Sequence, residues 1–82
     1  MNISMEISMY PLATEYVPLI RAFIDGLAVR PGIEVKTNTM STQVFGDLDL
    51  VMNALREGLR ESWTEQGKSV FVVKLINSDL RP

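Results

Sequence analysis

The chain of 82 residues contains no cysteine and no histidine. Without cysteine there are no disulfides and no thiolate nucleophiles, and without either residue the usual zinc and copper ligands are missing. General acid–base catalysis also loses the side chain that ordinarily titrates near pH 7. The ten acidic residues follow no EF-hand spacing, and the five glycines stand singly rather than in a phosphate-binding loop. We therefore expect no metal, no cofactor and no enzymatic activity.

Long apolar runs and excess positive charge are absent too. No apolar stretch approaches the 18 or so residues of a membrane-spanning helix. A net charge of −2 and a pI near 4.9 leave no basic patch for nucleic acid. The beginning of the chain lacks the charged and apolar segments of a signal peptide, which predicts a cytoplasmic location. The length predicts one domain, residues 1–82, and the 46% apolar fraction predicts spare apolar surface in so short a chain.

The first half of the chain shows a strand pattern followed by a helix pattern. Polar and apolar residues alternate over residues 2–10, which predicts a half-buried strand. Pro11 should end this strand because proline cannot donate to a sheet ladder. A helix should follow with Thr14 as its N-cap. Its apolar positions fall at helical spacing: Val17, Ile20, Phe23, Ile24, Leu27 and Ala28.

The second half predicts two short strands, a helix and a last strand. Residues 33–37 and 41–46 are the strands, joined by a polar turn, and Asp47 is the expected N-cap of the second helix. Gly67 should end that helix, and residues 69–76 form the last strand. The apolar stripe of the helix is expected to comprise Leu48, Val51, Met52, Leu55, Leu59 and Trp63.

The resulting order β-α-β-β-α-β is that of a ferredoxin-like α+β fold. It predicts a four-stranded antiparallel sheet with two helices on one face. Val70, Val72 and Ile76 of the last strand would then point away from the helices. Because this second face is too apolar to remain in water, we expect it to pack against another subunit, giving a dimer or a tetramer.

Small polar side chains crowd the segment between the two middle strands. Asn38, Thr39, Ser41 and Thr42 offer hydroxyl and amide groups just before an apolar strand pattern. Such groups are typical of a site for a polar, mostly uncharged ligand. The alternative is a polar turn whose hydroxyls bond to their own backbone.

The predicted topology places this segment beside the end of the first strand. Strands one and three should run antiparallel, so Ser41 and Thr42 should lie near Ser8 and Tyr10. The start of the first helix opens at the same end of the sheet. This convergence favours a small-ligand site over a polar turn.

Two segments resemble a known family. They read Glu6-Ile7-Ser8-Met9-Tyr10-Pro11-Leu12 and Thr39-Met40-Ser41-Thr42-Gln43-Val44-Phe45-Gly46-Asp47. Together they resemble the YkoF-related family, whose members are ferredoxin-like and bind thiamine and its hydroxymethylpyrimidine moiety. The best-known type of this family carries two such modules in one chain, whereas this chain has one, so the resemblance implies that a second module comes from another subunit.

The resemblance implies thiamine or hydroxymethylpyrimidine as ligand, in salvage or transport. Neutral side chains such as Asn38, Ser41 and Thr42 would read the polar edge of an aminopyrimidine, and Tyr10 would flank its ring. Glu6 would lie near the cationic thiazolium of thiamine. The candidate ligand-binding residues are Glu6, Ser8, Tyr10, Asn38, Thr39, Ser41 and Thr42.

Two other hypotheses stay open beside the binding protein. One is a small dimeric enzyme without cofactor that acts at the same end of the sheet, although no residue has an ordinary pKa near 7. The other is an oligomeric regulatory or assembly domain that uses the open sheet face and binds no ligand.

Overall fold

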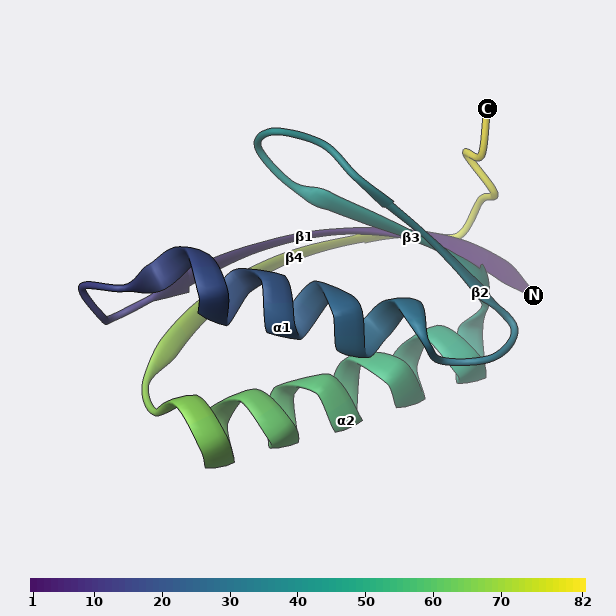
Figure 1. Cartoon of the computed structure of the whole chain (residues 1–82). Helices are drawn as coiled ribbons and strands as arrows, with labels where there is room; N and C mark the ends of the chain where they lie inside the picture. The colour runs from purple at the N-terminus through teal and green to yellow at the C-terminus, as the bar shows by residue number, and fades with distance from the viewer.

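Six elements follow one another in the order β-α-β-β-α-β in the computed structural model, which describes all 82 residues (Figure 1). They are β1 (Asn2–Pro11), α1 (Tyr16–Ala28), β2 (Ile33–Thr37), β3 (Thr42–Asp47), α2 (Leu48–Gln66) and β4 (Ser69–Ile76). No helix is long and apolar enough to cross a membrane.

The four strands form one antiparallel sheet in the order β2-β3-β1-β4. Both helices lie on the same face of this sheet, as Figure 1 shows. The predicted ferredoxin-like α+β fold is therefore confirmed. On its β3 side, β1 is paired only as far as Ile7, which lies opposite Thr42. On its β4 side it continues to Pro11, opposite Ser69.

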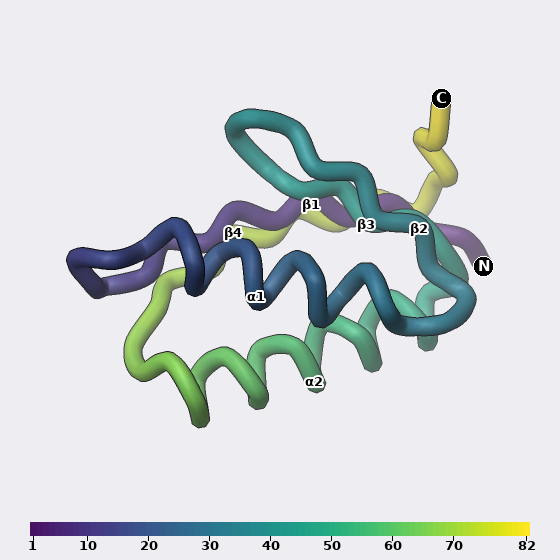
Figure 2. Tube along the Cα trace, in the orientation of Figure 1, coloured from purple at the N-terminus to yellow at the C-terminus, as the bar shows by residue number.

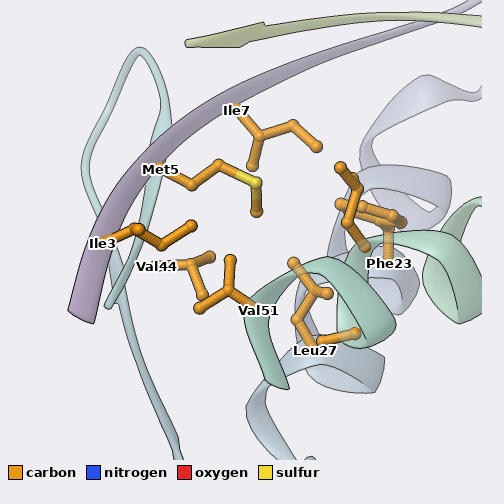
Figure 3. Close-up of a cluster of buried hydrophobic side chains, with 9 residues drawn as sticks. Ile3, Met5, Ile7, Phe23, Leu27, Val44 and Val51 are labelled. Carbon is orange, nitrogen blue, oxygen red and sulfur yellow. The ribbon is translucent and has the colours of Figure 1, made fainter. Parts of the chain in front are cut away.

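The core fills the space between the sheet and the helices (Figure 3). Alternate residues of β1 point into it, because side chains of a strand alternate between the two faces. The same alternation places Val44 of β3 in the core. The buried apolar cluster comprises Ile3, Met5, Ile7, Phe23, Leu27, Val44, Val51, Ala54 and Leu55.

The start of α1 differs from the prediction. Thr14 is not the N-cap; Glu15 occupies that position, and no side chain bonds to the free amides of the first turn. Pro18 is the third residue of the helix, where its missing N–H would have no intrahelical partner in any case. Pro11 is still part of β1, so this strand ends one residue later than its proline predicts.

The bounds of α2 agree with the prediction, but its buried face agrees only in part: Val51 and Leu55 of the predicted stripe are buried. The Asp47 carboxylate accepts a hydrogen bond from the Asp49 amide at 3.0 Å, and Gly67 ends the helix with φ of 81°. Leu48, Met52 and Trp63 are 38–50% exposed. Buried in their place are small residues: Ala54, Gly58 and Ser62. The reason is the close packing of the two helices, because a Cβ on Gly58 would lie 3.1 Å from the Phe23 ring.

The segment of residues 77–82, here called the C-terminal strap, lies on the sheet face away from the helices. Ser4 is buried beneath it: its hydroxyl donates to the Ser78 carbonyl at 2.7 Å and accepts from the Leu80 amide at 2.8 Å. Figure 2 shows the strap leaving β4 on this side of the sheet.

The strap also covers Phe45 of β3. The side chain of Phe45 points away from the helices, yet it is only 3% exposed. The Arg81 guanidinium lies over its ring at 5.9 Å, and two hydrogen bonds to Asp79 hold that guanidinium in place. The open sheet face is thus partly covered by the chain itself, which the sequence did not predict.

Candidate ligand-binding site

A cavity of about 170 Å³ opens where β1 extends beyond its pairing with β3. Its walls come from the end of β1, the middle of α1 and the loop between β2 and β3, which rises from the sheet in Figure 2. The lining residues are Ile7, Ser8, Met9, Tyr10, Ile20, Phe23, Ile24, Thr37, Asn38, Thr39, Met40, Ser41 and Thr42.

The backbone creates this space by a difference in strand length. After Ile7 the chain of β1 continues for four residues without a β3 neighbour. The β2–β3 loop, residues 38–41, turns back at this level and is closed by a hydrogen bond from the Asn38 amide to the Ser41 carbonyl at 2.8 Å. The cavity therefore lies between the unpaired edge of β1, the loop and α1.

The floor of the cavity is apolar. Ile7 and Met9 contribute from β1, while Ile20, Phe23 and Ile24 contribute from α1. The Phe23 ring is fixed from behind by Phe71, whose ring centroid lies 4.8 Å away. A rigid apolar floor of this kind favours a flat ring over a flexible or charged ligand.

The rim of the cavity is polar and largely free of internal bonds. The side chains of Asn38, Thr39, Thr42 and Ser8 make no hydrogen bond within the chain. The hydroxyl–backbone bonds of a merely polar turn are thus missing. Thr42 is only 5% exposed and pairs with Ile7, so its side chain faces the cavity from the helix side of the sheet.

No acidic or basic side chain lines the cavity. Six of the seven predicted site residues do line it: Ser8, Tyr10, Asn38, Thr39, Ser41 and Thr42. The seventh, Glu6, lies on the sheet face away from the helices and reaches the site only through Ser41, whose hydroxyl donates to a Glu6 carboxylate oxygen at 3.1 Å. The other carboxylate oxygen of Glu6 is 3.6 Å from the Lys74 ammonium.

The sequence does not predict the apolar lining. Ile20 and Ile24 belong to the predicted core stripe of α1, although both are only half-buried. The signal available was their position: this part of the helix lies at the same end of the sheet as the polar loop. No group of three or more acidic residues lies close enough together to hold a metal ion.

No protein-family profile and no curated protein matches this chain. Solved structures do resemble it at low sequence identity. The protein SP2199 from Streptococcus pneumoniae superposes with a TM-score of 0.87 at 21% identity, over 98% of this chain and 90% of that one. A candidate thiamine biosynthesis/salvage protein, TM0486 from Thermotoga maritima, gives 0.84 at 14% identity, over 95% and 85%. A domain of unknown function, DUF77, from Bacillus cereus gives 0.78 at 14% identity, over 96% and 78%. At these identities the likeness shows a shared fold.

Proposed function

We propose that this chain is a non-catalytic binding protein for thiamine or its hydroxymethylpyrimidine precursor, acting in salvage or transport, and that it is related to the YkoF-related proteins. The observation that carries the proposal is the cavity, which combines an apolar floor, a hydrogen-bonding rim and no charged lining residue. The structural neighbour from Thermotoga maritima, a candidate thiamine biosynthesis/salvage protein, supports the same proposal.

The size of the cavity favours the pyrimidine half of thiamine. Its volume of about 170 Å³ is smaller than the roughly 300–1,000 Å³ of sites for drug-sized ligands, so it suits a single substituted ring. In this proposal the aminopyrimidine lies inside, and the thiazolium of thiamine lies outside in solvent. A cation inside an uncharged cavity would lose hydration without a compensating charge.

The rim residues match the edge of an aminopyrimidine, which carries one amino donor and ring-nitrogen acceptors. Hydroxyl and amide groups such as those of Asn38, Thr39 and Thr42 can both donate and accept. Tyr10 lines the cavity and is 55% exposed, and in this proposal its ring flanks the ligand. Burial of one face of such a ring on Phe23 and its neighbours would supply most of the binding free energy.

Glu6 is a weaker candidate for contact with the thiazolium than the sequence indicates. Its carboxylate already accepts the Ser41 proton and is close to the Lys74 ammonium. Part of its charge is therefore compensated within the chain. Hydroxymethylpyrimidine and thiamine should accordingly bind with similar affinity.

Self-association is the second part of the proposal. Val70 and Val72 are about half exposed on the sheet face away from the helices, beside Tyr10. The strap covers the Ser4 end of this face but not the Tyr10 end. A second copy packed on the uncovered half would give a dimer, and this surface is also the feature that favours the alternative of a regulatory or assembly domain.

Titration calorimetry with hydroxymethylpyrimidine and thiamine tests the proposal. Thr42→Ala should weaken binding of both roughly three- to tenfold, because one neutral hydrogen bond of about 0.5–1.5 kcal/mol is lost. Thr64→Ala, the same change at an exposed site on α2, serves as the control and should bind like the wild type.

Two results would overturn the proposal. Wild-type protein that binds neither compound at millimolar concentration would remove the ligand assignment. Conversion of either compound during incubation, detected by mass spectrometry, would remove the non-catalytic assignment.

A further inference from the structure

Ser41 is the one hydroxyl of the cavity rim whose proton has a fixed acceptor. The Ser41 Oγ donates to Glu6 Oε2 at 3.1 Å, while the other polar side chains of the rim bond to nothing in the chain. We propose that Glu6 determines ligand specificity through this bond: it holds the Ser41 proton away from the cavity, so that the ligand must bring an N–H donor to Ser41. This inference rests on the proposed function and specifies that the ligand group beside Ser41 is a hydrogen-bond donor.

The carboxylate of Glu6 is held from two sides. Glu6 lies in the central strand, opposite Gln43 of β3 and Lys74 of β4. One of its oxygens accepts the Ser41 proton, and the other is 3.6 Å from the Lys74 ammonium. The two oxygens thus have different partners, Ser41 in the β2–β3 loop and Lys74 in β4.

The chemistry of the Ser41 hydroxyl then determines whether it donates or accepts a hydrogen bond on the cavity side. Serine carries one proton and two acceptor lone pairs, and a free hydroxyl rotates to suit either a donor or an acceptor. A hydrogen bond to a carboxylate is stronger than a bond between neutral groups. The Ser41 proton therefore stays on the Glu6 side, and a ligand group that reaches the Ser41 hydroxyl meets its oxygen as an acceptor.

This polarity distinguishes two closely related rings. An amino group on the pyrimidine can donate to the Ser41 oxygen. A ring carbonyl at the same position would instead place its oxygen lone pairs against those of the Ser41 oxygen, which is repulsive. A site built for a specific hydrogen bond rejects the analogue that cannot make it, since buried polar groups are left unpaired. Asn38, Thr39 and Thr42 cannot impose this choice, because each can reorient.

The experiment compares hydroxymethylpyrimidine, which has a 4-amino group, with its 4-oxo analogue, in which the 4-substituent accepts instead of donating and a ring nitrogen carries the proton. Wild-type protein should bind the amino compound roughly tenfold or more tightly than the oxo compound. Glu6→Ala should bring the ratio of the two dissociation constants close to one, because the freed Ser41 hydroxyl can then donate to the carbonyl. Glu34→Ala, which removes another carboxylate on the same sheet face, should keep the wild-type ratio. In a Ser41→Ala background, Glu6→Ala should change the ratio no further.

The outcomes separate this inference from the proposed function. Binding of the amino compound with a ratio unchanged by Glu6→Ala would overturn the inference alone. Binding of neither compound by the wild type would overturn the proposed function, and amide hydrogen exchange of residues 38–41 in the free protein would then decide the role of Glu6. Exchange should be faster in Glu6→Ala than in Glu34→Ala. Equal exchange in the two variants would show that Glu6 does not hold Ser41.

Discussion

Replacing Ser4 with alanine should destabilise the protein by detaching the C-terminal strap. The Ser4 hydroxyl is nearly inaccessible to solvent, donates to the Ser78 carbonyl at 2.7 Å and accepts from the Leu80 amide at 2.8 Å. Both bonds join residues that are more than 70 positions apart in the chain. No other side chain bonds to the backbone of the strap from outside it.

The expected loss follows from these two bonds. A neutral hydrogen bond contributes about 0.5–1.5 kcal/mol, so their loss should cost about 1–3 kcal/mol. The upper value requires the strap to stay in place with its carbonyl and amide unsatisfied. If the strap lifts instead, these groups bind water but the ring of Phe45 becomes exposed, which also costs free energy. In a domain of this size, each kcal/mol lowers Tm by about 4–8 °C.

The measurement is urea unfolding followed by the fluorescence of Trp63, the only tryptophan, which packs edge-on against Phe71. Ser8→Ala is the matched control, because Ser8 lies on the same strand and the same sheet face but its hydroxyl has no partner in the chain. Ser4→Ala should lose at least 1 kcal/mol more than Ser8→Ala. Losses that agree within about 0.5 kcal/mol would refute the role of the strap.

Three further outcomes are expected. Val72→Asp should lower the oligomeric state in sedimentation at micromolar concentration, and a wild type that is itself monomeric would contradict the proposed assembly. The hydrogen bond from the Asp49 amide lowers the pKa of Asp47 below 3.8; this stabilisation is present above the ordinary carboxyl pKa and is lost as pH falls through the lowered value. Asp47→Asn, which keeps the cap but does not titrate, should therefore be slightly less stable than the wild type near neutral pH and unfold with less acid dependence below pH 4. Gly46→Ala should destabilise the domain strongly in thermal unfolding, because the new Cβ would lie 2.9 Å from the Gly32 carbonyl, and a Tm like that of the wild type would show that Gly32 moves away from β3 at little cost.

Much of the fold was accessible from local pattern. The alternation in β1 and the helix cap at Asp47 can each be recognised from a few neighbouring residues. The buried face of α2 could not be predicted in full in this way. Whether Ala54 or Met52 is buried depends on how closely α1 approaches, and that distance is set by Phe23 meeting Gly58. A local pattern of apolar residues does not contain this information.

Only half of the candidate site could be predicted from the sequence, for a similar reason. Its polar rim is recognisable because small polar residues gather in one turn and the topology brings Ser8 and Tyr10 beside it. Its floor is not recognisable, since Ile20 and Ile24 look like ordinary core residues in a helix. The position of Glu6 behind Ser41 depends on the register of β1 against β3. The strap has no periodic pattern at all, and its partners include backbone atoms.

The contact between the strap and Ser4 also indicates how the chain could be reconnected as a circular permutant. The Leu80 amide lies 2.8 Å from the hydroxyl of Ser4, and both ends of the chain lie at the same end of the sheet in Figure 1. A short linker would join them, and Gly67, which has no neighbour within 4 Å of the position of a Cβ, would offer new ends. In such a circular permutant β4 would lead directly into β1. The pairing of longest range in the sheet would become a hairpin, and most of the loop-closure entropy that now opposes it would disappear.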